Sequence, residues 1–163
     1  MFQAKKIASD DKPGFYRELA KTMTALLDGE SDAIANAANA SALLYEMMSD
    51  LNWAGFYFLR GGELVLGPFQ GKTACVRIPV GRGVCGTAVE RRSSILVEDV
   101  HAFPGHIACD SASRSELVVP LTRGGVILGV LDLDSPSPSR FDADDRAGIE
   151  EIARIWVAAS APL

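Results

Sequence analysis

The stretch VRIPVGRGVCGTAVE, residues 76–90, joins a short extended run to a helix through a glycine-rich turn. It opens a region that continues through the apolar run 95–97 and a loop to two strand-like runs, 116–121 and 126–134. The strand-like runs are rich in Val and Leu, as strands of a buried sheet are. We therefore expect the helix that starts in this stretch to be short and to lie among the strands of a sheet.

Paired glycines predict two β-hairpins. The runs 53–58 and 63–66 flank Arg60-Gly61-Gly62, and the runs 116–121 and 126–134 flank Arg123-Gly124-Gly125. Glycine accepts the positive φ angles that tight hairpin turns need. The strands on either side of each turn should therefore be antiparallel.

Three longer helices are predicted around these strands. The first should begin near Lys12, with Pro13 at its first helical position, and Asp28-Gly29 should end it. Ser31 is the expected cap of the second helix, and Asp142 that of the last. We expect the second helix to bury one apolar face, made of Ile34, Ala38, Ala42, Tyr45 and Met48.

The length indicates one domain, residues 1–163, and the order of the predicted helices and strands indicates an α+β fold, an antiparallel sheet covered by helices. The apolar share of 48% and the charged share of 23% are those of an ordinary soluble globule. With a net charge of −5 and no basic run longer than Arg91-Arg92, nucleic acid is not expected as a partner. The sequence has neither a signal peptide nor an apolar run that could span a membrane, so we expect a cytoplasmic protein.

The chain has three cysteines, without a CxxC pair or a spacing that suits zinc. In a reducing compartment all three could be small buried apolar residues. Cys85 lies near a predicted helix start, which lowers a thiol pKa, so local reasoning favours it as the most acidic cysteine. Cys109 competes with it, because it follows His106 by three residues in a loop. No third catalytic group is evident, so the sequence does not favour a Cys-His hydrolase.

The segment 81–86 also matches the glycine pattern of dinucleotide-binding proteins, G-x-G-x-x-G. That site requires a parallel sheet built from βαβ units. The hairpins predicted here are antiparallel, so these glycines are better explained by a tight strand-to-helix turn.

Two further groups of residues, one aromatic and one acidic, need an explanation. Trp53, Gly55 and Tyr57 alternate along one strand and share a face, which suits core packing or an aromatic wall around a small apolar group. Asp132 and Asp134 also share a face, on a strand that otherwise reads as buried. They could be solvent-exposed at the strand end. If instead Glu116 on the partner strand joins them, the three carboxylates could hold an ammonium group.

Taken together, these residues resemble the GAF-domain free methionine-(R)-sulfoxide reductases. The likeness extends from the first helix to Trp156 and includes all three cysteines of the family within their motifs. The matching segments are 52–57 (NWAGFY), 67–71 (GPFQG), 74–78 (ACVRI), 83–87 (GVCGT), 106–110 (HIACD), 115–116 (SE) and 131–135 (LDLDS).

The resemblance implies a GAF-like six-stranded antiparallel sheet and a pocket for free methionine sulfoxide. It implies that Cys109 is the nucleophile, Cys75 the main resolving thiol and Cys85 an auxiliary one, which overrides the local preference for Cys85. Two groups would bind the substrate: an aromatic wall around its methyl-sulfur end, and carboxylates that bind its amino group and polarise the sulfoxide. The wall is Trp53 and Tyr57, and the carboxylates are Glu116, Asp132 and Asp134.

Such a reaction leaves a sulfenic acid that a second cysteine converts to a disulfide, which a dithiol such as thioredoxin reduces. No metal or organic cofactor is expected, and a homodimer stays open beside a monomer. The rival interpretation is a GAF sensor module that binds a small ligand and has inert cysteines. Sensors usually carry an output domain, and none is seen in this sequence, which favours the enzyme.

Overall fold

A six-stranded antiparallel sheet forms the centre of the protein. The computed structural model describes residue 2, residues 6–105 and residues 111–163. The sheet order is β3-β2-β1-β6-β5-β4, and all the strand pairs are antiparallel. The strands are β1 (Trp53–Arg60), β2 (Glu63–Gly71), β3 (Arg77–Pro79), β4 (Ile95–Val97), β5 (Ser115–Arg123) and β6 (Val126–Ser135).

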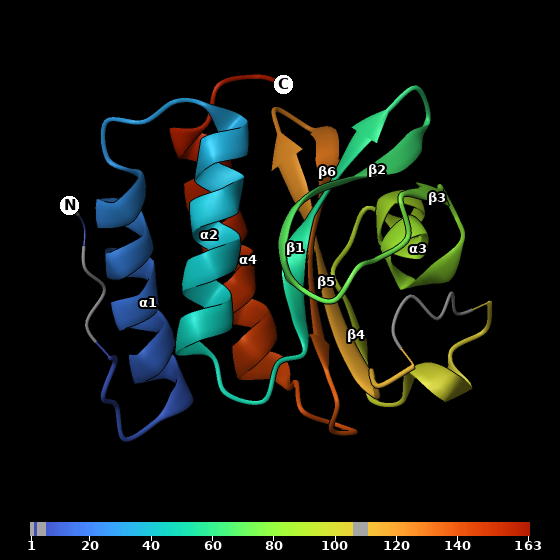
Figure 1. The fold of residues 1–163 in the computed structure, drawn as a ribbon, viewed down its shortest axis with the longest axis horizontal. Helices are drawn as coiled ribbons and strands as arrows, with labels where there is room; N and C mark the ends of the chain where they lie inside the picture. The colour runs from blue at the N-terminus through green and yellow to red at the C-terminus, as the bar shows by residue number, and fades with distance from the viewer. Residues whose placement is uncertain (1, 3–5, 106–110) are drawn as a thin grey trace.

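Helices cover both faces of this sheet. Figure 1 shows α1, α2 and α4 stacked on one side and α3 on the other. The helices are α1 (Lys12–Leu27), α2 (Ala33–Met47), α3 (Gly83–Arg91) and α4 (Ala143–Ala159), and a short 3₁₀ turn, η1, spans Val100–Ala102. The predicted α+β architecture and both glycine hairpins are confirmed, and the antiparallel sheet rules out a Rossmann site. None of the helices in the described part of the chain is long and apolar enough to cross a bilayer.

The face of the sheet under α2 and α4 carries a large apolar core. Phe56 and Phe58 of β1 point to it and pack against Trp156 of α4, with ring centroids 5.1 and 5.8 Å apart. Leu131 and Leu133 of β6 lie on the same face and are fully buried. Because side chains alternate along a strand, the residues between these ones must point to the opposite face, toward α3.

Helix α2 differs from the prediction in its cap and in its buried face. The side chain of Asp32, not Ser31, accepts hydrogen bonds from the first backbone amides. The predicted face, apart from Met48, is exposed, and Ile34 and Tyr45 are among its exposed residues. The residues that are buried instead include many small ones, which let α2 pack closely on the sheet: Ala33, Asn36, Ala37, Ala40, Ser41, Leu43 and Leu44. Alanines occur on both sides of this helix, so the apolar pattern did not distinguish them.

The other helix ends follow the sequence closely. Asp11 caps α1, and α4 begins with the predicted capping box between Asp142 and Asp145. The carboxylate of Asp145 also accepts hydrogen bonds from the Tyr16 hydroxyl at 2.7 Å and from Lys12 at 2.6 Å. This buried network ties the first and last helices together.

Candidate functional site

Three carboxylates gather on the α3 face of the sheet. Glu116 of β5 lies opposite Asp134 of β6, and Asp134 in turn lies opposite Trp53 of β1. Asp132 lies opposite Gly55 by the same register. Residues directly opposed in an antiparallel pair point to the same face, so the predicted geometry of the carboxylates and aromatics is confirmed. Glu116 and Asp132 are buried, and Asp134 is half-buried.

Helix α3 brings a thiol to these carboxylates. Cys85 lies in its first turn, and the thiol donates a hydrogen bond to Oε1 of Glu116 at 3.9 Å. The helix can pack this closely because a Cβ on Gly86 would lie only 2.3 Å from the carbonyl oxygen of Pro79. The Cys85 sulfur and one oxygen each of Glu116 and Asp132 lie within 4.8 Å of one another, close enough to hold a cation between them. Among the described residues, Oδ1 of Asp132 has no hydrogen-bond partner.

Burial changes the proton affinity of this cluster. Burial raises the pKa of Asp132 to about 7, although hydrogen bonds from Cys85 and Glu116 oppose the shift. The pKa of Glu116 is raised well above its ordinary value, first by burial and then by the charges of Asp132 and Asp134. Both shifts favour the protonated form of these carboxyls, and a protonated carboxyl is a potential general acid.

The thiol of Cys85 does not behave as the sequence suggested. A helix N-terminus lowers a thiol pKa, but burial raises the pKa of Cys85 well above its ordinary value, and Asp132 and Glu116 add to the rise. The partial charge of the helix end is outweighed by loss of water and two nearby carboxyls. Cys85 is a free thiol in the structure and is held in its protonated form.

Trp53 and Tyr57 form a stacked aromatic wall beside the carboxylates. Their ring centroids are 5.8 Å apart, and Trp53 also stacks on Phe69 of β2 at 5.3 Å. Gly55 does not leave an open gap between them. A Cβ at that position would lie 2.4 Å from the Cβ of Phe69 and 2.6 Å from the Trp53 ring, so glycine is needed for the stack to form.

The wall is also tied to the loop that carries Cys75. The Tyr57 hydroxyl donates a hydrogen bond to the Cys75 carbonyl at 3.0 Å, and the indole NH of Trp53 donates one to the Lys72 carbonyl at 3.2 Å. Burial, followed by the charge of Asp132, raises the pKa of Tyr57, so its hydroxyl stays a donor. Cys75 is half-buried and disulfide-bonded.

Phe69 was not singled out from the sequence. A regular hairpin counted back from the Arg60–Glu63 pair would place Pro68 opposite Gly55. A register shift between Gly55 and Tyr57 places Phe69 there instead. Such a bulge adds one residue to one strand and depends on the packing of the whole sheet, which a local pattern does not report.

The structure brings together seven of the eight residues expected at the site. They are Cys75, Cys85, Trp53, Tyr57, Glu116, Asp132 and Asp134. The predicted nucleophile, Cys109, and the neighbouring His106 lie outside the described residues.

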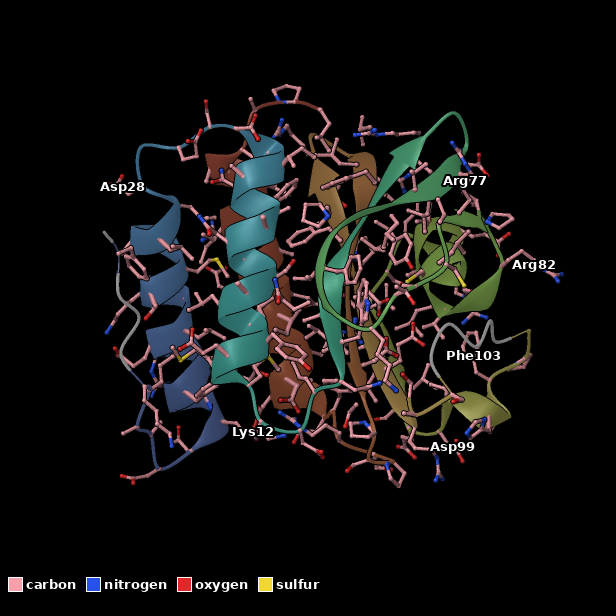
Figure 2. The ribbon with its side chains drawn as sticks, viewed as in Figure 1. Lys12, Asp28, Arg77, Arg82, Asp99 and Phe103 are labelled. Atoms are coloured by element: carbon pink, nitrogen blue, oxygen red, sulfur yellow. The ribbon has the colours of Figure 1, made fainter. Side chains whose placement is uncertain are left out.

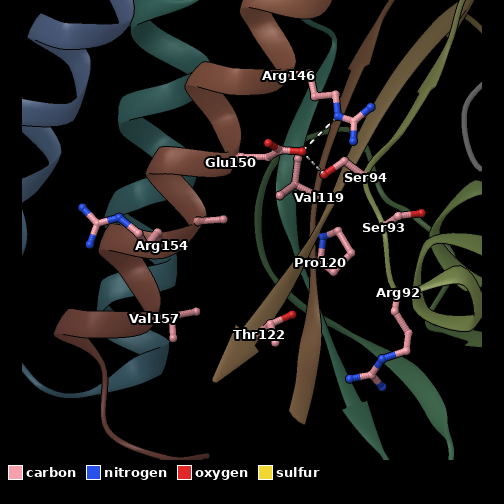
Figure 3. A pocket seen from close by; sticks show the side chains of 11 residues that line it. Arg92, Ser93, Ser94, Val119, Pro120, Thr122, Arg146, Glu150, Arg154 and Val157 are labelled. Atoms are coloured by element: carbon pink, nitrogen blue, oxygen red, sulfur yellow. Dashed lines mark hydrogen bonds and ion pairs between the residues drawn. The ribbon is translucent and has the colours of Figure 1, made fainter. Parts of the chain in front are cut away.

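A separate hollow lies on the opposite side of β5 and holds none of these residues. It has a volume of about 410 Å³ and is lined mainly by α4 and by the segment that follows α3. Figure 3 shows Glu150 there, which accepts hydrogen bonds from Ser94 at 2.6 Å and from Arg146 at 2.9 Å. Ser94 and Arg146 thus satisfy the Glu150 carboxylate, and no cysteine is among the residues that line the hollow.

Comparison with known proteins gives a consistent result. Residues 37–159 match the GAF domain family. The free methionine-R-sulfoxide reductase of Escherichia coli K12 is 56% identical over 142 residues, which cover 87% of this chain and 86% of that protein. The enzyme of the same name from Saccharomyces cerevisiae is 40% identical over 153 residues, which cover 89% of this chain and 85% of that protein.

The fold comparison agrees with the sequence comparison. The X-ray structure of free methionine-R-sulfoxide reductase from Neisseria meningitidis in complex with its substrate is 45% identical, with a TM-score of 0.93. The match covers 98% of this chain and 95% of that one. The chain therefore belongs to the GAF domain family and, within it, to the group of free methionine-R-sulfoxide reductases.

Proposed function

We propose that this protein reduces free L-methionine-(R)-sulfoxide to methionine. The observation that carries the proposal is the buried cluster of Cys85, Glu116 and Asp132 beside the Trp53–Tyr57 wall. Buried carboxylates destabilise a fold unless they meet a cation or hydrogen-bond donors. Oδ1 of Asp132 has no such donor among the described residues, so the ammonium group of a free amino acid suits it.

The carboxyls differ in the roles that their environments favour. Asp134 is half-buried and Asp132 has a pKa of about 7, so an approaching ammonium group would hold both in the ionised form. Burial and the charges of Asp132 and Asp134 raise the pKa of Glu116 well above its ordinary value, which favours its protonated form. We therefore assign amine binding to Asp132 and Asp134, and protonation of the sulfoxide oxygen to Glu116.

The chemical step then requires a nucleophile and a resolving thiol. The Cys109 thiolate attacks the sulfoxide sulfur, the oxygen takes a proton and transfers to the cysteine as hydroxyl, and methionine leaves. Cys109 is left as a sulfenic acid. The thiol of Cys75 attacks that sulfur, water leaves, and a disulfide forms. The reaction uses no metal or organic cofactor.

The state of the described cysteines supports Cys75 as the main resolving residue. Cys75 is disulfide-bonded, whereas Cys85 is a free thiol. The raised pKa of Cys85 keeps it protonated, and a protonated thiol is a poor nucleophile. Cys85 is better suited to donate its hydrogen bond to Glu116 than to resolve the sulfenic acid.

We further propose that residues 1–163 act as one catalytic domain in the cytoplasm and that thioredoxin is the reductant. A GAF sensor module with inert cysteines is the alternative. The disulfide at Cys75 favours the enzyme, because a ligand sensor has no need of a redox-active thiol pair.

The deciding experiment measures NADPH oxidation with thioredoxin and thioredoxin reductase, using each epimer of methionine sulfoxide, free and within a peptide. Only the free R epimer should be consumed, and Cys109→Ser should abolish turnover without unfolding the protein. In a single turnover, Cys75→Ser should release about one methionine per subunit. With thioredoxin in multiple turnover, Cys75→Ser should not be regenerated, whereas Cys85→Ser should be. Binding of a small ligand without any turnover by the wild type would favour the sensor instead.

A further inference from the structure

The buried carboxyls beside Cys85 are not paired with a cation in the described part of the chain. None of the ion pairs formed there involves Glu116 or Asp132, although both residues are only 6% exposed. Two arginines that precede Cys85 are directed elsewhere. Arg77 is ion-paired with a carboxylate of β2, and Figure 2 shows Arg82 extending away from the ribbon. Buried acidic groups without a cation destabilise a fold, so this cluster favours a cationic ligand.

Asp132 has an oxygen that is available to such a ligand. Its side chain lies on the α3 face of β6, beside Cys85 and Glu116. Among the described residues, Oδ1 of Asp132 is buried and accepts no hydrogen bond. A buried acceptor without a donor is costly, because it has lost its contact with water and gained no other partner. A cation held in the cluster restores that lost interaction.

The distances in the cluster suit a single metal ion. Zn²⁺ binds sulfur at about 2.3 Å and carboxylate oxygen at about 2.0–2.2 Å, so two such ligands of one ion lie at most about 4.5 Å apart. Sγ of Cys85 and Oε1 of Glu116 are 3.9 Å apart, and one oxygen of Asp132 completes a set of three atoms within 4.8 Å of one another. Shifts of a few tenths of an ångström therefore bring all three atoms onto one ion.

The thiol decides which cation fits the cluster. Carboxylates alone serve an ammonium group or a hard ion such as Mg²⁺, whereas a thiolate prefers zinc and softer metals. Cys85 is a free thiol while Cys75 is disulfide-bonded, so Cys85 remains available when the enzyme is oxidised. We propose that Cys85, Glu116 and Asp132 form a binding site for a thiophilic divalent cation, with Zn²⁺ as the ion to test. On binding, the three ligands release their protons to the solvent and leave a fourth position on the ion for water.

An ion bound at this site inhibits the enzyme. It occupies the space assigned above to the ammonium group of the substrate, and its bond to Glu116 removes the proposed general acid. Zn²⁺ therefore competes with free methionine sulfoxide. Binding of the ion rests on the geometry of the cluster alone, whereas the inhibition rests on the proposed function.

The first test measures binding to the oxidised protein by titration against a chromophoric chelator. The wild type should bind one Zn²⁺ per subunit, and an equal concentration of Mg²⁺ should not displace it. Cys85→Ser and Asp132→Asn, checked for folding by circular dichroism, should each weaken binding by more than about 100-fold, since even groups that only support a metal ligand are worth about 10- to 100-fold. His101→Ala is the matched control, because His101 is an exposed metal-binding side chain outside the cluster. It should bind Zn²⁺ as the wild type does.

The second test measures inhibition in a single turnover of the pre-reduced protein, without a reductant that would itself chelate the metal. Zn²⁺ should slow the release of methionine, and a higher concentration of methionine sulfoxide should relieve the inhibition. Each variant is compared with its own rate in the absence of zinc. In Cys85→Ser, the Zn²⁺ concentration that halves the rate should rise by the same factor as the dissociation constant.

Three outcomes would overturn the metal site: equal Zn²⁺ affinity in the wild type and Cys85→Ser, displacement of Zn²⁺ by an equal concentration of Mg²⁺, or an equal loss of affinity in His101→Ala. Inhibition that the substrate does not relieve would overturn the competition at the ammonium position. Failure of the proposed function has a different outcome. The wild type would then release no methionine, while the titration, which needs no turnover, would still measure the metal site.

Discussion

The two faces of the central sheet use the same strands for opposite purposes. On the face under α2 and α4, Phe56 of β1 and Leu131 of β6 are fully buried among apolar side chains. On the α3 face, Tyr57 and Asp132, each one residue further along its strand, lie in the cluster of carboxyls and aromatics. One face stabilises the fold through apolar burial, and the other carries buried polar groups that weaken it. In this protein stability and chemistry are separated by a single step along each strand.

The largest effect is expected when the same substitution, phenylalanine to alanine, is made on each face of the sheet. Phe56→Ala should lower the free energy of unfolding by about 3–5 kcal/mol, because Phe56 is fully buried against Trp156. The activity of the folded fraction should be retained. Phe69→Ala on the α3 face removes a half-buried ring and should cost less stability while raising the KM for substrate. Denaturant unfolding and steady-state kinetics on both variants check this, and the reverse pattern would contradict the division between the faces.

The second prediction concerns pH and the α3 face. The pKa of Asp132 is raised from 3.8 to about 7 on folding, so the folded state binds a proton that the unfolded state has lost. The contribution of Asp132 to the free energy of unfolding is fully present below pH 4 and is lost as the pH rises through 7. The loss is at most about 4 kcal/mol. Glu116 shifts in the same direction.

The variant Asp132→Asn removes this titration and should flatten the dependence of unfolding free energy on pH. It should also be more stable than the wild type at pH 8. Unfolding in urea between pH 4.5 and 8.5 measures both. Parallel curves for the two proteins would mean that Asp132 ionises at its ordinary pKa despite its burial.

The third prediction uses the substrate to test the same carboxylates. N-acetyl-methionine-(R)-sulfoxide lacks the charged amine and should have a kcat/KM about 100-fold below that of the free amino acid, or about 2.7 kcal/mol. Asp134→Ala should narrow this gap, mainly by slowing the free substrate. Rates with both substrates in both proteins are compared under the same conditions. Equal rates on free and acetylated substrate in the wild type would assign the acidic cluster another role.

The smallest effect compares two buried tyrosines. Tyr57→Phe removes the hydrogen bond to the Cys75 carbonyl and should lower the free energy of unfolding by about 1 kcal/mol. Tyr16→Phe, in the helical layer, removes a bond to the Asp145 carboxylate, which also pairs with Lys12 and Arg140. This should cost about 2 kcal/mol, since bonds to groups in ion pairs are stronger. Thermal and urea unfolding of the two variants give the order, and an inverted order would show that the α3 face is the more rigid.

Most of the fold could be predicted from local patterns. The alternation in β1 and β6 assigned Trp53 and Tyr57 to one face and Asp132 and Asp134 to one face, and the glycine pairs predicted both hairpins. These features depend on a period of two residues and on turn geometry, which neighbouring residues set by themselves. The assignment to the methionine sulfoxide reductases likewise came from short segments of sequence.

Only the tertiary structure decided the properties that depend on residues far apart in the sequence. The apolar pattern of α2 predicted Ile34 and Tyr45 as buried, but packing on the sheet selected the opposite side. The bulge in the β1–β2 pair brought Phe69 to Trp53. The helix end predicted an acidic thiol at Cys85, whereas the carboxyls of two other strands and the exclusion of water raise its pKa. Solvation and charge act through space, so the residues that determine them are far apart in the sequence.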